Sequence, residues 1–519
     1  MIPPLPVLFV WPVVAYILFQ RFDRPRALVL TILLGYLFLP EHVGLNLPVL
    51  PTLEKSSIPS LAACAMLFLL RPQGAAARRR AGEAGLAGLV PRSRPIQVLL
   101  LMMVGGAFLT PLANGDPIRF TAGGLPGLGM YDSFSSVMTA VIGLLPLLLA
   151  RKYLATPESH RMLLGILAIA GAGYAILALW EIRMSPQLSA QIYGIGARSW
   201  DQQLRAGGYR PLVFLEHGLW LGIFFACATL AAFAAWRAAP PETRPRYLGA
   251  GLVLLVTLGL SKTLGALMIV IVLLPVILFL SVRLQMLVAA AIAALVIFYP
   301  PLRSADIVPV DRVVEFARGI SAERAGSLQF RINNEDALLD KAMERPVLGW
   351  GGWGRARVYD EDGRDLSITD GRWVIAMGLG GLTRYFGEFG LLAGALLLLA
   401  LRRRSFEIDA ATAGLCLVLA ANLVDLLPNA GLTPLTWLLA GALIGRVELA
   451  RVQPDDAMPA PVSLRAGRRW RGGAPAAPDA SPDPGLVTAR DPAADPPRRT
   501  RYTRFAGPAT GRARSPRKA

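Results

Sequence analysis

Long apolar segments recur along most of the chain and constrain its fold more than any other feature. A helix that crosses about 30 Å of hydrocarbon needs about 20 mostly apolar residues, and about thirteen segments approach that rule. They lie near residues 4–20, 27–46, 57–70, 96–113, 134–150, 162–180, 216–236, 247–260, 264–281, 286–300, 374–401, 410–427 and 432–446.

A chain that is 54% hydrophobic and only 17% charged has too few charged residues to cover a water-exposed surface. Lipid removes that requirement, and helices satisfy their own backbone hydrogen bonds within it. The sequence therefore predicts an all-α fold, a polytopic membrane bundle of about 12–14 transmembrane helices over residues 1–450.

The positions of lysine and arginine orient this predicted bundle, because cytoplasmic loops carry an excess of both. Basic residues cluster just after the first segment and near 71–95, 151–161, 237–246 and 402–404. These clusters alternate correctly if the N-terminus is periplasmic and the C-terminus cytoplasmic, as expected of a multi-pass protein of a bacterial inner membrane. The same orientation predicts periplasmic loops at residues 114–131, 181–215 and 301–373.

The composition changes after the last apolar segment. Residues 451–519 include 14 basic and 6 acidic side chains among many prolines, alanines and glycines, which predicts a disordered, basic cytoplasmic tail. The tail is either simply solvated or attracted to anionic lipid headgroups, at about 1 kcal/mol per basic residue near the surface. Nucleic acid is not an expected partner, because no recognisable binding module accompanies the net charge of +18.

Cysteine and histidine are too scarce to predict a metal centre. The three cysteines, Cys64, Cys227 and Cys416, all lie in apolar segments and are typical of small core residues. The chain has only three histidines. We expect neither a metal nor a cofactor.

Four cations lie at the predicted outer face of the membrane, where the charge rule disfavours them. Arg210 and Lys262 are each explained, taken alone, by a side chain whose stem packs on apolar surface while its head reaches water. Together the four cations predict a pocket for an anionic group at the outer face, because arginine binds phosphate bidentately without a metal. The four are Arg210, Lys262, Arg331 and Arg372.

Carboxylates close to these cations in the sequence are candidates for a catalytic base. They are Glu216, Glu335, Asp336 and Asp370, and His217 is a further candidate. Glu216 and His217 have another interpretation as caps in the first turn of a helix, where negative charge suits the helix dipole.

The 301–373 loop contains its own helical pattern. Pro346 should end that helix, and the glycines after it permit positive φ and a close approach by a ligand or another helix. The apolar spacing predicts an amphipathic helix on the membrane surface, carried by Phe330, Ala337, Leu338 and Ala342.

The order of several motifs resembles the O-antigen ligase and O-antigen/exopolysaccharide polymerase superfamily of membrane glycosyltransferases. The resemblance spans roughly residues 200–445. It is carried by Gly208-Tyr209-Arg210 with His217, by Ser261-Lys262-Thr263, by Arg331 with Glu344-Arg345-Pro346-Val347-Leu348-Gly349-Trp350-Gly351, by Thr369-Asp370-Gly371-Arg372-Trp373, and by Tyr385-Phe386-Gly387-Glu388-Phe389-Gly390-Leu391-Leu392.

This resemblance implies a metal-independent, inverting transfer of glycan from an undecaprenyl-diphosphate-linked oligosaccharide to a sugar acceptor at the periplasmic face. It also implies that Arg210, Lys262, Arg331 and Arg372 bind the donor diphosphate. Because diphosphate is a good leaving group, charge stabilisation can replace a general acid, while a nearby base removes the acceptor proton.

The chain departs from the family pattern at two positions. Ligases carry a histidine, usually followed by asparagine, at the end of the large loop, where this chain reads Thr369-Asp370-Gly371-Arg372-Trp373 and has no histidine beyond His217. Lys262 stands where the family often has arginine, and lysine lacks the bidentate geometry. The first departure favours a polymerase over a ligase and makes Asp370 the preferred catalytic base, followed by Glu216 and His217.

The leading prediction is therefore a polysaccharide polymerase, and the alternative within the same class is a ligase with a different acceptor. The expected partners are the lipid bilayer, a chain-length regulator and other polysaccharide-assembly proteins. A flippase for lipid-linked oligosaccharide is the alternative of another class, although no clear internal repeat supports it. Arg384 and Glu388 would then line a cavity, or would mark the junction of a re-entrant piece with a true helix. A scaffold without catalysis would leave the outward cations unexplained.

Overall fold

The computed structural model describes residues 1–70, 86, 88–121, 123–198, 200–205, 207–305, 307, 310–320, 322–401 and 408–452. The chain divides into two units, Met1–Met458 and Pro459–Ala519. The predicted disordered tail lies outside the described residues from 453 onward, as does most of the basic loop at 71–95.

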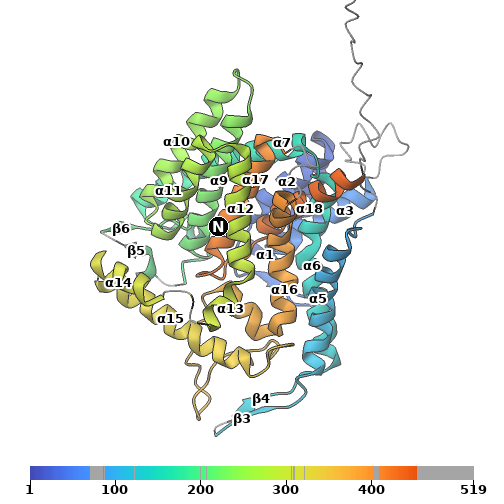
Figure 1. Ribbon diagram of the computed structural model, residues 1–519, viewed down its shortest axis with the longest axis vertical. Coiled ribbons are helices and arrows are strands. Elements are labelled where there is room, and N and C mark those ends of the chain that lie inside the picture. The colour runs from blue at the N-terminus through green and yellow to red at the C-terminus, as the bar shows by residue number, and fades with distance from the viewer. Residues whose placement is uncertain are drawn as a thin grey trace, which may run out of the picture. The chain divides into compact units, whose positions relative to one another are not determined.

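The described part of the first unit is mostly helical, and each apolar segment expected from the sequence coincides with a helix (Figure 1). The helices of the bundle are α1 (Pro4–Arg21), α2 (Arg24–Phe38), α3 (Ile58–Leu69), α5 (Arg94–Leu112), α6 (Met130–Tyr153), α7 (Pro157–Met184), α9 (Gly218–Ala238), α10 (Arg244–Leu260), α11 (Leu264–Phe279), α12 (Val282–Ile297), α16 (Arg372–Leu401), α17 (Ala410–Asp425) and α18 (Pro434–Val452).

Six helices in the described residues are long and apolar enough to cross a membrane: α1, α5, α6, α7, α9 and α16. Their outward surfaces are apolar, as lipid requires; Leu101 on α5 is 70% exposed and Ile176 on α7 is 68% exposed. Such a surface would associate in water. These features are those of a multi-pass membrane protein, in which α9 is the central helix, packed against α7, α10, α11 and α17.

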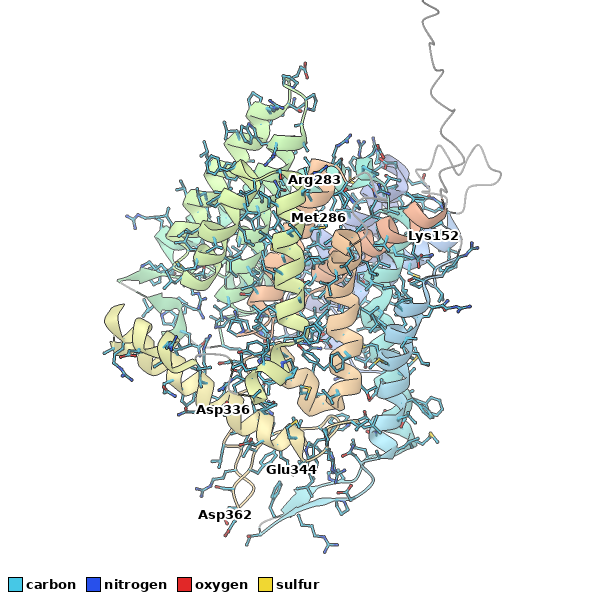
Figure 2. The ribbon with its side chains drawn as sticks, viewed as in Figure 1. Lys152, Arg283, Met286, Asp336, Glu344 and Asp362 are labelled. Atoms are coloured by element: carbon cyan, nitrogen blue, oxygen red, sulfur yellow. The ribbon has the colours of Figure 1, made fainter. Side chains whose placement is uncertain are left out.

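The connections hold further elements at one end of the bundle. Three helices, α13 (Tyr299–Ser304), α14 (Val310–Ile320) and α15 (Ala322–Met343), lie there with the hairpin of β3 (Ile118–Phe120) and β4 (Gly123–Leu125). The turn between α9 and α10 lies at the opposite end (Figure 1). We call the end that carries α13–α15 and β3–β4 the loop end. Figure 2 shows Asp336, Glu344 and Asp362 at this end, and Lys152 and Arg283 toward the other.

The expectation of an all-α chain is correct for the bundle and wrong for its connections. Besides β3–β4, antiparallel pairs form between β1 (Gly44–Leu45) and β2 (Leu53–Glu54), and between β5 (Leu204–Arg205) and β6 (Gly208–Tyr209). The connections also hold the short helix α8 (Leu188–Tyr193) and a 3-10 turn, η1 (Asp201–Gln203).

The segment expected to be helical over 27–46 is a helix only to Phe38. Leu39 is extended, with φ −72° and ψ 149°, and precedes Pro40. The proline ring disfavours the helical conformation of the residue before it, so the chain leaves α2 here and enters the β1–β2 hairpin.

The segment expected at 374–401 is also not one continuous helix. The backbone of α16 breaks at Gly380 (φ −146°, ψ 15°) and Gly381 (φ 61°, ψ −159°). A break exposes backbone donors and acceptors that a membrane interior cannot hydrate, so other protein groups must satisfy them. This geometry agrees with the junction between two helical pieces that the polar residues of this segment had suggested.

The chain immediately after Pro346 fills the break. Leu382 N donates to Pro346 O at 2.7 Å, Trp350 N donates to Gly378 O at 2.8 Å, and Gly351 N donates to Leu379 O at 3.0 Å. We call residues 346–351 the docking segment, because its backbone pairs with α16 on both sides of the break.

Two glycines make this approach possible. Gly349 has φ +63°, and a Cβ placed there would lie 2.6 Å from the backbone nitrogens of Gly380 and Gly381. Gly381 has φ +61°, and its Cβ would lie 2.5 Å from Pro346 O. The expected close approach of another helix to the glycines after Pro346 is thus confirmed at Gly349.

Replacement of Gly349 by alanine should therefore destabilise the protein. The left-handed conformation alone costs a side chain about 1–2 kcal/mol, and the contact with α16 adds to it. Gly352→Ala, in the same loop but in open space, should change the free energy of unfolding by less than about 0.5 kcal/mol. Thermal unfolding of the two purified variants measures the difference; equal midpoints would mean that the docking segment is not closely packed.

Candidate functional site

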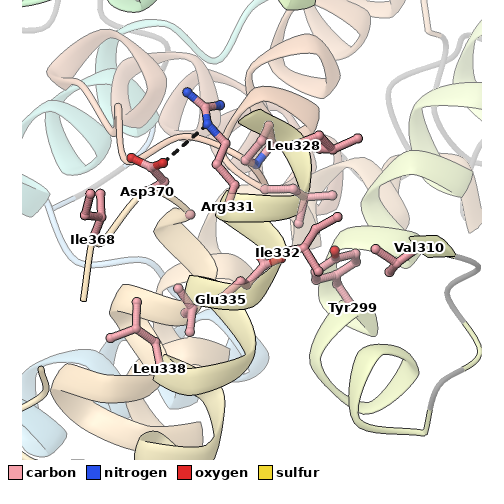
Figure 3. Close-up of a pocket in the computed structure, with 13 residues that line it drawn as sticks. Tyr299, Val310, Leu328, Arg331, Ile332, Glu335, Leu338, Ile368 and Asp370 are labelled. Atoms are coloured by element: carbon pink, nitrogen blue, oxygen red, sulfur yellow. Dashed lines mark ion pairs between the residues drawn. The ribbon is translucent and has the colours of Figure 1, made fainter. Parts of the chain in front are cut away.

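A pocket of about 200 Å³ lies at the loop end, between α15 and the beginning of α16 (Figure 3). Most of its wall is apolar, and its charged groups are one arginine and two carboxylates. The lining residues are Tyr299, Val310, Leu328, Arg331, Ile332, Glu335, Leu338, Ile368, Asp370, Gly371, Val374, Leu427 and Pro428.

Helix α15 supplies one face of this pocket. Its lining residues are Leu328, Arg331, Ile332, Glu335 and Leu338, spaced three or four apart, so they share one side of the helix. The amphipathic helix expected in the large loop is therefore present, and its face is turned to the pocket and to α16. Leu338 and Ala342 are buried as expected, but Phe330 is 53% exposed and Ala337 is exposed as well.

Arg331 and Asp370 meet across the pocket. Nε of Arg331 lies 3.4 Å from Oδ2 of Asp370, and both side chains remain more than a third exposed. The ion pair engages Nε, and the guanidinium has further donors on its two Nη atoms. Arg331 also acts electrostatically on Asp425, at the end of α17. The structure thus brings together one predicted donor-binding cation and the preferred catalytic base.

Glu335 lies one helical turn from Arg331 on the same face (Figure 3). Nε1 of Trp373, a buried residue of α16, donates a hydrogen bond to its Oε1. Burial raises the pKa of the Glu335 carboxyl to about 7, although the hydrogen bond from Trp373 and the charge of Arg303 act in the opposite direction. Its neighbour Asp336 forms an ion pair with Arg303 of α13. Glu335 is thus a carboxyl group that changes protonation close to neutral pH.

Arg372, predicted to bind the donor, is turned into the bundle. It donates from Nε and Nη2 to the two oxygens of Glu388 at 2.5 and 2.6 Å. Glu388 is fully buried, and its Oε2 lies 3.6 Å from Nε of Arg384. Arg372 lies outside the pocket lining, and this geometry assigns it a structural part: it ties the first turn of α16 to the helix beyond the break.

Arg210 and Lys262 lie by the β5–β6 hairpin. The Arg210 side chain is buried against Gly218 at the beginning of α9, and the Lys262 ammonium packs against Gly208 of β6. Lys262 occupies the expected turn between α10 and α11, with φ +58°. Neither residue lines the pocket that contains Arg331.

Glu216 and His217 are also outside that pocket. His217 is the N-cap of α9, where its Nδ1 accepts from Leu219 N at 3.1 Å and its Nε2 lies 3.0 Å from Oε1 of Gln202. Glu216 lies 3.6 Å from Nη1 of Arg198. His217 takes the capping arrangement that was the alternative to a catalytic one.

The segment between Arg210 and α9 is held by buried polar groups that sequence reasoning missed. Glu181, on α7, accepts from the backbone nitrogens of Leu212 and Val213 at 2.8 and 2.7 Å. The hydroxyl of Tyr174, seven residues before Glu181 on the same helix, accepts a hydrogen bond from Phe214 N at 3.2 Å. The sequence did contain a signal for this contact. Tyr174 and Glu181 are polar residues on an apolar helix, and their spacing of seven places both on one face.

Arg345, in the Glu344-Arg345-Pro346 motif that contributes to the family resemblance, forms structural contacts. Arg345 donates to Oδ1 of Asn114 at 2.6 Å and to Oδ2 of Asp116 at 2.7 Å, and its guanidinium lies 4.1 Å from the centre of the Trp350 ring. The hydrogen bond from Arg345 lowers the pKa of Asp116. Arg345 thus clamps the docking segment to the connection after α5.

Among the described residues, no group of three or more His, Cys, Asp or Glu side chains could hold a metal ion. Comparison with known proteins finds no protein-family model that matches the chain, and no curated protein that matches its sequence. The assignment of a function therefore depends on the site itself and on the motifs in the sequence.

The buried charge network makes a testable prediction. Glu388→Gln leaves Arg372 and Arg384 close together without their carboxylate, and loss of one partner of a buried pair costs about 3–5 kcal/mol. Arg357→Gln, which removes the partly exposed pair with Asp365, should cost at most about 1 kcal/mol. Thermal or denaturant unfolding in detergent compares them, and similar losses in both would contradict the structural part given to Glu388.

Proposed function

We propose that the protein is a membrane glycosyltransferase of the polysaccharide-polymerase type. It transfers glycan from an undecaprenyl-diphosphate-linked donor to a sugar acceptor at the periplasmic face of a bacterial inner membrane, without a metal. The observation that carries the proposal is the pocket at the loop end, where an arginine and two carboxylates share an otherwise apolar wall. An amphiphile with an anionic head and an apolar tail suits such a lining.

Arg331 is the proposed binding group for the diphosphate. Its guanidinium reaches the pocket beside Asp370, and a partly exposed ion pair of this kind is weak enough to rearrange around a ligand. An arginine held there would stabilise the charge that develops on the leaving diphosphate, as a fixed dipole or cation does in other transfer reactions.

The other proposed donor-binding residues have less support from the geometry. Arg210 and Lys262 keep that proposed role through the sequence resemblance and their common position by the β5–β6 hairpin. Arg372 is better explained by its pairing with Glu388. The polymerase is favoured over the ligase because residues 369–373, the stretch where ligases carry a histidine, contain none.

Arg331→Ala should abolish long glycan in cells that depend on this protein, because the diphosphate loses its bidentate partner. Arg364→Ala, which removes an exposed cation from the same large loop, should leave the glycan unchanged. Gel analysis of cell polysaccharide, with membrane levels of each variant measured by immunoblot, provides the comparison. Normal chain length in Arg331→Ala cells would contradict the catalytic assignment.

The intermediate that accumulates in the Arg331→Ala cells distinguishes the alternatives. A polymerase defect accumulates single repeat units on the lipid carrier, whereas a ligase defect accumulates full-length lipid-linked polymer. A flippase forms no glycosidic bond, so bond formation by the purified protein with lipid-linked donor would exclude it.

The proposed orientation puts the loop end in the periplasm. Cysteine introduced at exposed Gly352, at the loop end, should react with a membrane-impermeant maleimide in intact spheroplasts. Cysteine at Arg283, toward the other end of the bundle (Figure 2), should react only after permeabilisation. Native Cys227 and Cys416 are buried, and Cys64 is replaced by alanine as a control. The reverse labelling pattern would overturn the orientation.

A further inference from the structure

Two carboxyl groups line the pocket, and their surroundings differ. Asp370 faces the cation of Arg331 at 3.4 Å and is more than a third exposed. Glu335 is more buried and receives its hydrogen bond from a neutral group, Nε1 of Trp373. Where neighbouring carboxyl groups have such different environments, they take different parts in proton transfer.

We propose that Glu335 is the catalytic base that takes the proton from the acceptor hydroxyl, and that Asp370 is the counter-ion that positions Arg331. This inference rests on the glycosyl transfer proposed above. It replaces Asp370 in the catalytic part that the sequence favoured.

The arrangement of the pocket supports this division. Figure 3 shows Arg331 and Asp370 at one end of the pocket and Glu335 a helical turn away, near Tyr299 and Leu338. In an inverting displacement the acceptor attacks opposite the leaving group, so the base and the diphosphate-binding cation must stand apart. Residues four positions apart on a helix rise by about 6 Å, and their side chains can diverge from there.

Trp373 fixes the orientation of the base. Its Nε1 donates to Oε1 of Glu335, which leaves Oε2 as the oxygen that can accept a proton. The Trp373 ring is fully buried and meets the Tyr299 ring edge to face, with the ring centres 5.0 Å apart. The indole is therefore itself held in place. A base with a fixed orientation has the geometry that general-base catalysis requires.

The reaction balances as a single displacement. The acceptor oxygen forms a bond to the anomeric carbon while the bond from that carbon to the diphosphate oxygen breaks. Diphosphate leaves with the electron pair and is held by Arg331, and the hydroxyl proton passes to Glu335. Release of that proton to water returns the base for the next transfer.

The charged and titratable groups around Glu335 define the expected pH dependence. Asp336 on α15 and Asp370 before α16 carry negative charges that disfavour its ionisation, while the hydrogen bond from Trp373 and the charge of Arg303 on α13 favour it. Tyr299 on α13 is neutral near pH 7, because burial and the charge of Glu335 raise its pKa to about 12. Burial is the largest influence and places the pKa of Glu335 at about 7. A base acts when it is ionised, so transfer should rise with pH through about 7 and decline below it.

The test compares variants of the full chain in membranes that contain the native lipid-linked donor. Glu335→Gln should lower the rate of transfer by about 10²–10⁴-fold, the range for loss of a general base, and remove the rise near pH 7. Binding of undecaprenyl diphosphate to the purified variant should be unchanged. Glu344→Gln, which removes an exposed carboxylate near the end of the same helix, should keep the wild-type rate and profile.

A second measurement does not depend on activity. Infrared difference spectra of the purified protein should show a band from a protonated carboxyl group that titrates near pH 7. The band should be absent in Glu335→Gln. In Asp370→Asn the midpoint of its titration should move to lower pH, because a negative neighbour is removed. A wild-type rate and pH profile in Glu335→Gln would overturn the assignment, even if Arg331→Ala abolished transfer. Failure of the wild-type protein to transfer glycan from the lipid-linked donor, or to bind undecaprenyl diphosphate, would instead overturn the proposed function and this inference with it.

Discussion

The hydrogen bonds between the docking segment and the broken helix α16 are the interaction on which the loop end depends. Helix α16 gives up its own backbone pairing at Gly380 and Gly381, where no water is available to replace it. Residues 346–351 supply the missing partners. Because the same segment follows α15 and is clamped by Arg345, this contact holds α15 against the first turns of α16, and the pocket lies between those two helices.

The charges at the loop end fall into two kinds according to what surrounds them. Arg372 and Glu388 are buried and satisfy each other bidentately, so separating them would leave a charge without solvent. Arg331 and Asp370 meet through a longer contact with both side chains partly exposed. A ligand can reach the exposed pair of Arg331 and Asp370 but not the buried pair of Arg372 and Glu388. Arg372 is therefore assigned a structural part and not a binding one.

Non-helical backbone is stabilised in the same way elsewhere. The segment from Leu212 to Phe214 is buried, and its backbone groups are met by Glu181, Tyr174 and Lys55, whose ammonium donates to Phe214 O at 2.5 Å. Burial lowers the pKa of Lys55, while its ion partner Glu41 acts against that shift. Polar residues that look isolated in the sequence thus hold irregular chain in an apolar surrounding.

The sequence by itself determined the helices, because each apolar segment must be long enough to cover its backbone in lipid, and composition records that requirement directly. It also indicated a helix within the large loop and a close approach after Pro346. It did not distinguish charged residues that stabilise the fold from those that can bind a ligand. Arg372 and Arg331 are equivalent candidates in the sequence, and only the structure shows that Arg372 pairs with Glu388, sixteen residues further along the chain. Nor did it show that Asp370 would pair with Arg331 while Glu335 would receive its hydrogen bond from Trp373. Those distinctions depend on contacts between distant segments, and burial, which sets the pKa of a carboxyl group, exists only in the folded chain.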